Sequence, residues 1–171
     1  MVTSLPDPDP SPRASETRID TLAAGVEAID TLIDLARDRL RVFDRDLADG
    51  GWASAQRAEK LSAFLRRSRG ARLAIIVHDP RYLEASCPRL LGLLKIHSHA
   101  IDVWRTGPEA RHAQDALVIA DVDHHLHRFH SDHLRATLAV HAPQATRPLI
   151  ARFDEIWATG VPALGGSVLG L

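Results

Sequence analysis

The chain contains 171 residues with a formal net charge of −1, and 45% of the residues are hydrophobic. This length suits one α/β domain, and the apolar content excludes a largely disordered chain. The near-neutral charge argues against a general nucleic-acid binder, so we expect no nucleic-acid partner. The single cysteine, Cys87, excludes an intrachain disulfide and a cysteine-based zinc site.

The two ends of the chain differ in composition from its middle. Four prolines alternate with Asp and Ser near the N-terminus, and each lacks a backbone donor. We therefore expect a disordered Pro/Asp-rich tail over 1–17, a folded domain over 18–158 and an irregular Gly-rich tail over 159–171. The N-terminus does not resemble a secretory signal, and the longest apolar runs are too short for a membrane span. We expect a cytoplasmic protein without a membrane partner.

Hydrophobic periodicity divides the middle of the chain into alternating helices and strands. Helical spacing predicts a helix over 24–38, and the alternation that follows predicts a strand over 39–44. Helical spacing returns over 53–69, and the apolar run Leu73–Val77 predicts a strand buried on both faces. The remaining predicted elements are a helix over 90–96, strands over 100–104, 116–120, 124–129 and 135–140, and a last helix near Leu149 with Pro148 in its first turn. This order predicts an α/β sheet covered by helices.

Polar residues follow several of the predicted strands. Ligands of open α/β folds gather at the carboxyl ends of strands, so these residues are candidates for a small polar or anionic ligand site. The alternative is that they cap helices and tie loops through ion pairs. The candidates are Asp44, Arg45, Asp46, His78, Asp79, Arg81 and Asp121.

Histidines offer a second candidate site. The chain has ten histidines, and on a strand His125 and His127 lie on one face, as a pair of metal ligands would. No further ligand stands at a diagnostic spacing, and a titrating polar loop explains the cluster equally well. We expect no metal and no cofactor, and keep a His-rich metal-binding module as an alternative.

One segment carries a family resemblance. The stretch Gln114–Asp121, followed by a strand and by the helical segment Phe153–Trp157, resembles the His-x-Lys-x4-Asp region of the phospholipase D superfamily. The segments Phe43–Leu47 and Val77–Arg81 are similar to an uncharacterised bacterial domain of this fold, found alone or fused to GNAT-type acetyltransferases. The resemblance covers about 18–158 and implies a single phospholipase D-like domain, a mixed β-sheet flanked by helices.

The departures from that family pattern bear on function. In phospholipase D enzymes the motif His is the nucleophile and the Lys neutralises phosphate charge, but those positions hold Gln114 and Ala116, and only Asp121 matches. The resemblance therefore implies a catalytically inactive module that binds a ligand or a protein. The alternative enzyme is a phosphodiesterase-like or other hydrolase with an altered site built from His78, Asp79 and Asp121. The family habit also suggests a homodimer, and the fusion suggests an acetyltransferase partner.

Overall fold

The computed structural model describes residues 12–164, which form a mixed eight-stranded sheet in the order β1-β7-β6-β5-β2-β3-β4-β8. The strands are β1 (Ser15–Ile19), β2 (Arg39–Asp44), β3 (Arg72–Val77), β4 (Ile101–Arg105), β5 (Ala116–Ala120), β6 (His124–Arg128), β7 (Ala136–Val140) and β8 (Val161–Pro162). The helices are α1 (Leu22–Leu35), α2 (Ala55–Arg67), α3 (Arg81–Ser86), α4 (Pro88–Ile96) and α5 (Pro143–Ala158), with 3-10 turns at Ala48–Gly50 and Pro108–Ala110. The predicted α/β class with a mixed, helix-flanked sheet is confirmed.

The direction of the strands divides the sheet into two halves. β2, β3 and β4 run parallel, whereas β5, β6, β7 and β1 continue the sheet through antiparallel pairs. β5 is antiparallel to β2, with Leu40 opposite Ala120 and Phe43 opposite Leu117. The end of β2 therefore lies beside the beginning of β5, which decides where the motif residues meet.

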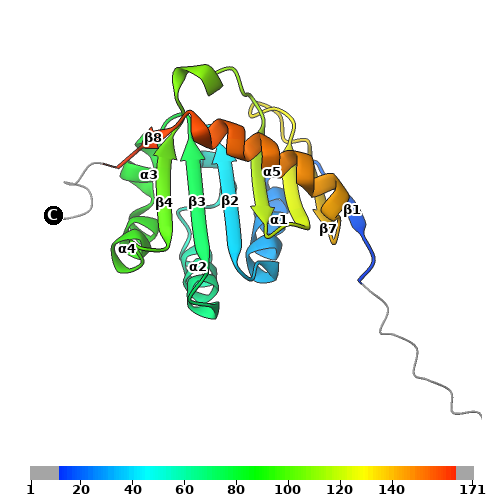
Figure 1. Cartoon of the computed structure of the whole chain (residues 1–171), viewed down its shortest axis with the longest axis horizontal. Coiled ribbons are helices and arrows are strands. Elements are labelled where there is room, and N and C mark those ends of the chain that lie inside the picture. The colour runs from blue at the N-terminus through cyan, green and yellow to red at the C-terminus, as the bar shows by residue number, and fades with distance from the viewer. Residues whose placement is uncertain (1–11, 165–171) are drawn as a thin grey trace, which may run out of the picture.

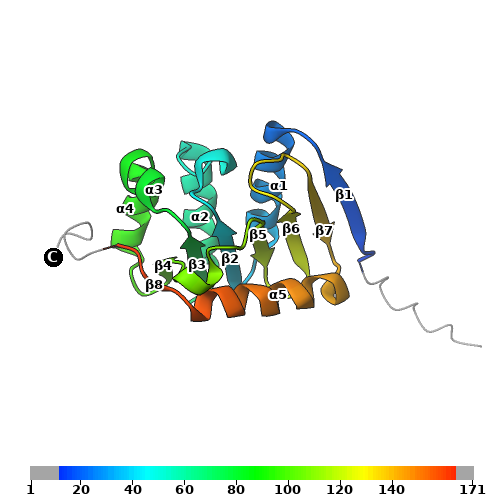
Figure 2. The ribbon, with the colours of Figure 1, turned by 90° about the horizontal axis from the view of Figure 1, so that it is seen from above.

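Helices cover the two faces of the sheet unequally. α1, α2, α3 and α4 lie on one face, and α5 alone crosses the other (Figures 1 and 2). The larger core fills the space under the four helices and includes Leu32, Leu73 and Ile75. The smaller core joins Phe43 and other sheet residues to Phe153 and Ile156 of α5. The alternating strand residues divide between these two cores because successive side chains point to opposite faces.

Side-chain caps and one buried arginine fix the first two helices. Thr21 accepts a hydrogen bond from the Ala24 N–H at the start of α1, and Ser54 accepts from the Arg57 N–H at the start of α2. The Arg57 side chain is 1% exposed, pairs with Asp30 of α1 and donates to the backbone carbonyl of Gly50. This guanidinium joins α1, α2 and the turn between β2 and α2.

The structure differs from the sequence prediction at both ends of the domain. β1 begins at Ser15, inside the segment 1–17 that we assigned to a tail, and pairs with β7 through backbone hydrogen bonds. Only Ile19 of this edge strand is buried, so its sequence shows little strand pattern. β8 likewise pairs with β4 inside the segment 159–171. The rest of the two predicted tails, 1–11 and 165–171, lies outside the described residues.

Two helices also differ from the prediction. α3 was missed because six residues are too few to show a helical period. α5 begins at Pro143 rather than near Leu149, so Pro148 lies inside the helix and not in its first turn. Pro148 cannot donate to the Gln144 carbonyl, but Gln144 is exposed and water can bond that oxygen. Within residues 12–164, no helix is both long enough and apolar enough to cross a membrane.

Candidate functional site

Gln114 and Ala116, which occupy the expected nucleophile and lysine positions, lie at the edge of the sheet where β2 and β3 end and β5 begins. We call this the motif edge. Gln114 is exposed, and its backbone carbonyl accepts a hydrogen bond from the Ser131 N–H (2.6 Å). Ala116 is buried, and its register partner on β6 is Arg128. A cation therefore stands on the strand beside the position where the family pattern has lysine.

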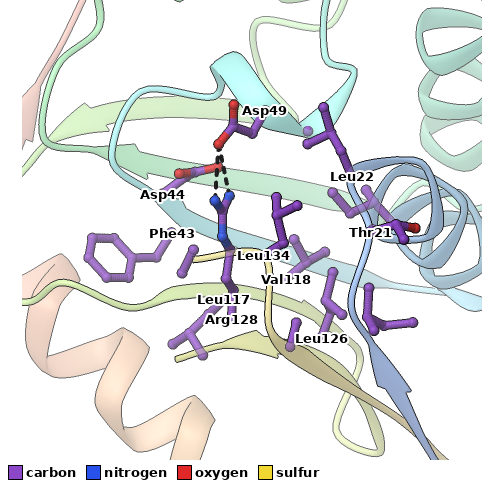
Figure 3. A pocket seen from close by; sticks show the side chains of 16 residues that line it. Thr21, Leu22, Phe43, Asp44, Asp49, Leu117, Val118, Leu126, Arg128 and Leu134 are labelled. Atoms are coloured by element: carbon purple, nitrogen blue, oxygen red, sulfur yellow. Dashed lines mark hydrogen bonds and ion pairs between the residues drawn. The ribbon is translucent and has the colours of Figure 1, made fainter. Parts of the chain in front are cut away.

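Arg128 makes four side-chain hydrogen bonds within the protein. Both of its terminal nitrogens lie 3.1 Å from Asp49 Oδ2. Nε donates to the His133 carbonyl and Nη2 to the Ser131 carbonyl, each at 2.6 Å. Figure 3 shows the guanidinium beside Asp44 and Asp49, with its dashed bonds to Asp49. This cation orders the β6–β7 loop and is neutralised, so its charge is not free for a phosphate group.

Asp44 lies at the end of β2 beside Arg128. Burial raises the pKa of Asp44 to about 6, against the hydrogen bond that its Oδ1 accepts from the Arg45 N–H (2.6 Å). The carboxyl lines a cavity of about 50 Å³ whose walls include Leu22, Leu134 and Val118 (Figure 3). A volume of this size has room for water or for one small group inserted from outside. The cavity is thus apolar with Asp44, Asp49 and Arg128 on its polar side.

His78 reaches the motif edge at the end of β3, but both of its ring nitrogens are occupied. Nδ1 lies 2.7 Å from Thr106 Oγ1, and Nε2 lies 2.7 Å from the Ala113 carbonyl. The carbonyl can only accept, so Nε2 carries a proton and donates it. The ring also meets Phe43 edge-on, with centroids 5.3 Å apart. His78 ties the ends of β3 and β4 to the segment before β5 and has no free nitrogen for proton transfer.

The other candidates that follow β2 and β3 form ion pairs. Arg45 bonds Asp132 (2.8 Å) and Asp46 (3.3 Å), which links the end of β2 to the β6–β7 loop. Asp79 accepts from the backbone and the side chain of Arg81 at the exposed start of α3. Hydrogen bonds from Arg81 lower the pKa of Asp79 to about 2. The contacts of these four candidates, Arg45, Asp46, Asp79 and Arg81, are those of the alternative interpretation, in which polar residues cap helices and tie loops through ion pairs.

Asp121 does not join the other candidates. It follows β5, which runs antiparallel to β2, so it lies at the opposite edge of the sheet. Its carboxylate accepts from the backbone N–H groups of Arg37, Asp38 and Arg39 at 2.8–2.9 Å. The sequence pattern groups Asp121 with the residues that follow β2 and β3, but the antiparallel direction of β5 separates it from them. A hydrolase built from His78, Asp79 and Asp121 together has no geometric basis.

A cluster that sequence reasoning missed lies under α5 next to the motif edge. Asp115 is buried and is bonded by Arg152 Nε (2.8 Å) and by His127 Nε2 (3.2 Å). Burial works against the charged form, but the bonds from His127 and Arg152 hold the pKa of Asp115 below its usual range. Asp115 and Arg152 are 37 residues apart in the sequence, so no local pattern could have predicted that they meet. His127 is therefore a hydrogen-bond partner of Asp115 in this structure.

His125 and His127, the alternative metal pair, are held by separate partners in this structure. His125 packs against α5, where its Nδ1 lies 2.8 Å from Thr146 Oγ1. Burial and the charge of His127 lower the pKa of His125 to about 4, so it is neutral at physiological pH. His127 is held by Asp115, as described above. The two side chains thus serve packing and pairing on the α5 face.

Asp123, His124 and His141 form another group of metal-ligand type, with one ligand atom of each within 4.8 Å of the others. However, His124 Nδ1 accepts the His141 backbone N–H at 3.0 Å, which places the ring proton on Nε2. Nε2 is the nitrogen that faces Asp123, at 3.5 Å. A metal on Nε2 would move the proton to Nδ1, against the backbone N–H. The geometry therefore fits a hydrogen-bonded turn rather than a metal centre.

Comparisons with known proteins place the chain in a family. The family model described as "Domain of unknown function (DUF7931)" matches residues 21–164. The chain belongs to this family. No curated protein matches the DUF7931 chain.

Solved structures share the fold of the DUF7931 chain at low identity. Nuc, a phospholipase D family member from Salmonella typhimurium, is 13% identical with a TM-score of 0.64 over 90% of this chain and 100% of its own. The archaeal chromatin protein TrmBL2 is 11% identical with a TM-score of 0.64, over 93% of this chain and 57% of its own. NucT from Helicobacter pylori is 10% identical with a TM-score of 0.57, over 88% and 100%. The fold is therefore phospholipase D-like.

Proposed function

We propose that this DUF7931 chain is a phospholipase D-like module without phosphodiesterase activity, and that it binds a partner at the motif edge. Two observations together carry the proposal. Gln114 and Ala116 stand where the family pattern has its nucleophile and its lysine. The neighbouring cation, Arg128, is already neutralised by Asp49. A carboxamide cannot form the covalent phosphoryl intermediate, and a methyl group carries no charge. Arg128 would have to give up Asp49 and two carbonyls before it could bind a phosphate.

The surface around the cavity supports a binding role. Leu22, Phe129 and Leu134 are 47%, 52% and 43% exposed, and two of them also line the Asp44 cavity. Exposed apolar side chains gathered around a partly polar cavity are typical of a docking surface. We propose a second copy of this chain as the first occupant, because the resembled family pairs two halves. An acetyltransferase is the other protein partner that the resemblance suggests.

The absence of catalysis is tested with bis-p-nitrophenyl phosphate. We expect no hydrolysis above the buffer rate by the purified wild-type chain, with and without divalent cations. Hydrolysis by the wild type that is lost in Asp44→Asn, with the fold retained by circular dichroism, would overturn the proposal. The same assay on His78→Gln separates a contaminating enzyme from activity that belongs to the chain.

The binding surface is tested by light scattering over a concentration series. One chain has a mass of 18.8 kDa, and we expect twice that mass for the wild type at high concentration. Phe129→Ser should shift the equilibrium towards the single chain. The matched control is Ile96→Ser, because Ile96 is 72% exposed on α4 and does not line the cavity. If the two substitutions change the mass equally, the motif edge is not the interface.

A further inference from the structure

A second polar surface lies at the other end of the sheet, on the face that carries α5. The helix crosses the strands near the motif edge, so the opposite halves of β2, β3 and β4 stay uncovered on this face (Figure 1). A groove of about 350 Å³ follows this uncovered area. Its floor is formed by strand residues and its wall by Phe153, Asp154 and Trp157 of α5. We call it the arginine groove.

Three arginines project into this groove from adjacent strands. Arg39 of β2 and Arg72 of β3 are register partners, and Arg41 stands two residues along β2 from Arg39. Adjacent strands lie roughly 5 Å apart, and two residues along a strand span roughly 7 Å. Like charges placed directly opposite each other destabilise a sheet. The arrangement is therefore unfavourable in the free protein.

The side-chain hydrogen bonds that these arginines donate go to backbone carbonyls and not to carboxylates. None of the three arginines makes an ion pair within 4.0 Å in residues 12–164; Arg41 donates only to the Asp121 carbonyl, and Arg72 only to the carbonyls of Arg69 and Ala71. Two carboxylates, Asp102 and Asp154, line the groove with the three arginines, and the charge of Asp121 also reaches Arg41. Burial and the charge of Arg39 lower the pKa of Arg41, although Asp154 and Asp121 oppose this effect. An anion in the groove would remove that repulsion.

Size and spacing narrow the kind of anion. The volume lies at the lower end of sites for small molecules, and it is far too small for a nucleic-acid duplex. Guanidinium groups match phosphate oxygens in a bidentate geometry. Three guanidinium groups spread over roughly 7 Å offer more donors than one phosphate group can accept, and their spacing fits two linked phosphate groups. We propose that the arginine groove binds a small molecule that carries two linked phosphate groups. This site lies at the other end of the sheet from the motif edge and goes beyond the proposed function.

Isothermal titration calorimetry with inorganic pyrophosphate tests the proposal on the full chain at low and at physiological salt. We expect binding to the wild type and about a tenfold loss of affinity in Arg39→Gln, because one charge-assisted contact is removed. Asp154→Asn should instead strengthen binding, since it removes a repulsive charge from the groove wall. Arg111→Gln and Glu155→Gln are the matched controls, because neither exposed residue lines the groove.

Two further probes, orthophosphate and a single-stranded oligonucleotide, distinguish the ligand class. Weaker binding of orthophosphate than of pyrophosphate supports two linked groups, whereas equal binding refutes them. Tighter binding of the oligonucleotide, weakened by Arg39→Gln, would overturn the small-molecule ligand in favour of a nucleic-acid strand. The site itself is refuted if the wild type binds no anion, or if Arg39→Gln and Arg111→Gln weaken binding equally. Opposite effects of Arg39→Gln and Asp154→Asn in folded proteins cannot result from general loss of structure.

Discussion

Replacing Asp44 by Asn should stabilise the protein at neutral pH and remove a pH dependence. In the folded chain burial raises the pKa of Asp44 from 3.8 to about 6, so the folded state holds the proton more tightly than the unfolded state. Below about pH 4 Asp44 is protonated in both states and does not lower the free energy of unfolding. Its charge lowers that free energy increasingly as the pH rises towards 6, and the full destabilisation is present above that pH. Asn keeps an oxygen for the Arg45 N–H and carries no charge.

The expected magnitude follows from the two pKa values. The difference between 3.8 and about 6 corresponds to about 3 kcal/mol, at about 1.4 kcal/mol for each pKa unit. Asp44 is half-buried and lies beside Arg128, so solvent and the charge of Arg128 reduce this unfavourable free energy. We expect Asp44→Asn to raise the free energy of unfolding by about 1–2 kcal/mol at pH 7.5 and to leave it nearly unchanged at pH 4.

Urea denaturation of the wild type and Asp44→Asn at half-unit steps from pH 4 to pH 8 measures this difference. The matched control is Asp79→Asn, which should change the free energy of unfolding in the opposite direction, because the charged Asp79 carboxylate stabilises the folded state. Hydrogen bonds from Arg81 lower the pKa of Asp79 to about 2, so its stabilisation is present above about pH 4 and is lost as the pH falls towards 2. The reasoning about Asp44 is refuted if Asp44→Asn is destabilising at pH 7.5, or if its effect is the same at pH 4 and pH 8.

Three further predictions concern the residues that hold the fold together. Arg57→Met should lower the free energy of unfolding by about 3–5 kcal/mol because it leaves Asp30 and the Gly50 carbonyl without their buried partner, and urea denaturation should show no comparable loss for the exposed Arg66→Met. Asp121→Ala should cost about 2–4 kcal/mol, since three backbone N–H groups lose their acceptor; a thermal midpoint equal to that of the wild type would contradict this. Gly51→Ala should cost about 1 kcal/mol in the same assay because Gly51 has φ +72°, and a neutral or stabilising effect would show that this turn relaxes.

Local patterns in the sequence determined most of the elements of this protein. The apolar runs of β3 and β5 and the helical spacing of α1 and α2 reproduce the observed elements to within two residues, except at the end of α1. Such patterns are local, because the alternation of one strand or the period of one helix depends only on its own neighbours. The motif resemblance likewise depended on a short run of residues, and the fold that it implied is confirmed.

The tertiary structure alone decided which side chains meet. Asp44 is the last residue of β2 and Asp121 directly follows β5, yet they lie at opposite edges because β5 runs antiparallel to β2. Arg39 and Arg72 look like scattered surface arginines in the sequence, but the parallel register of β2 and β3 sets them directly opposite each other. Strand direction and register arise from pairing between distant segments, and a one-dimensional pattern holds no record of that pairing. For this reason the sequence indicated the kind of domain, whereas its candidate sites required the folded chain.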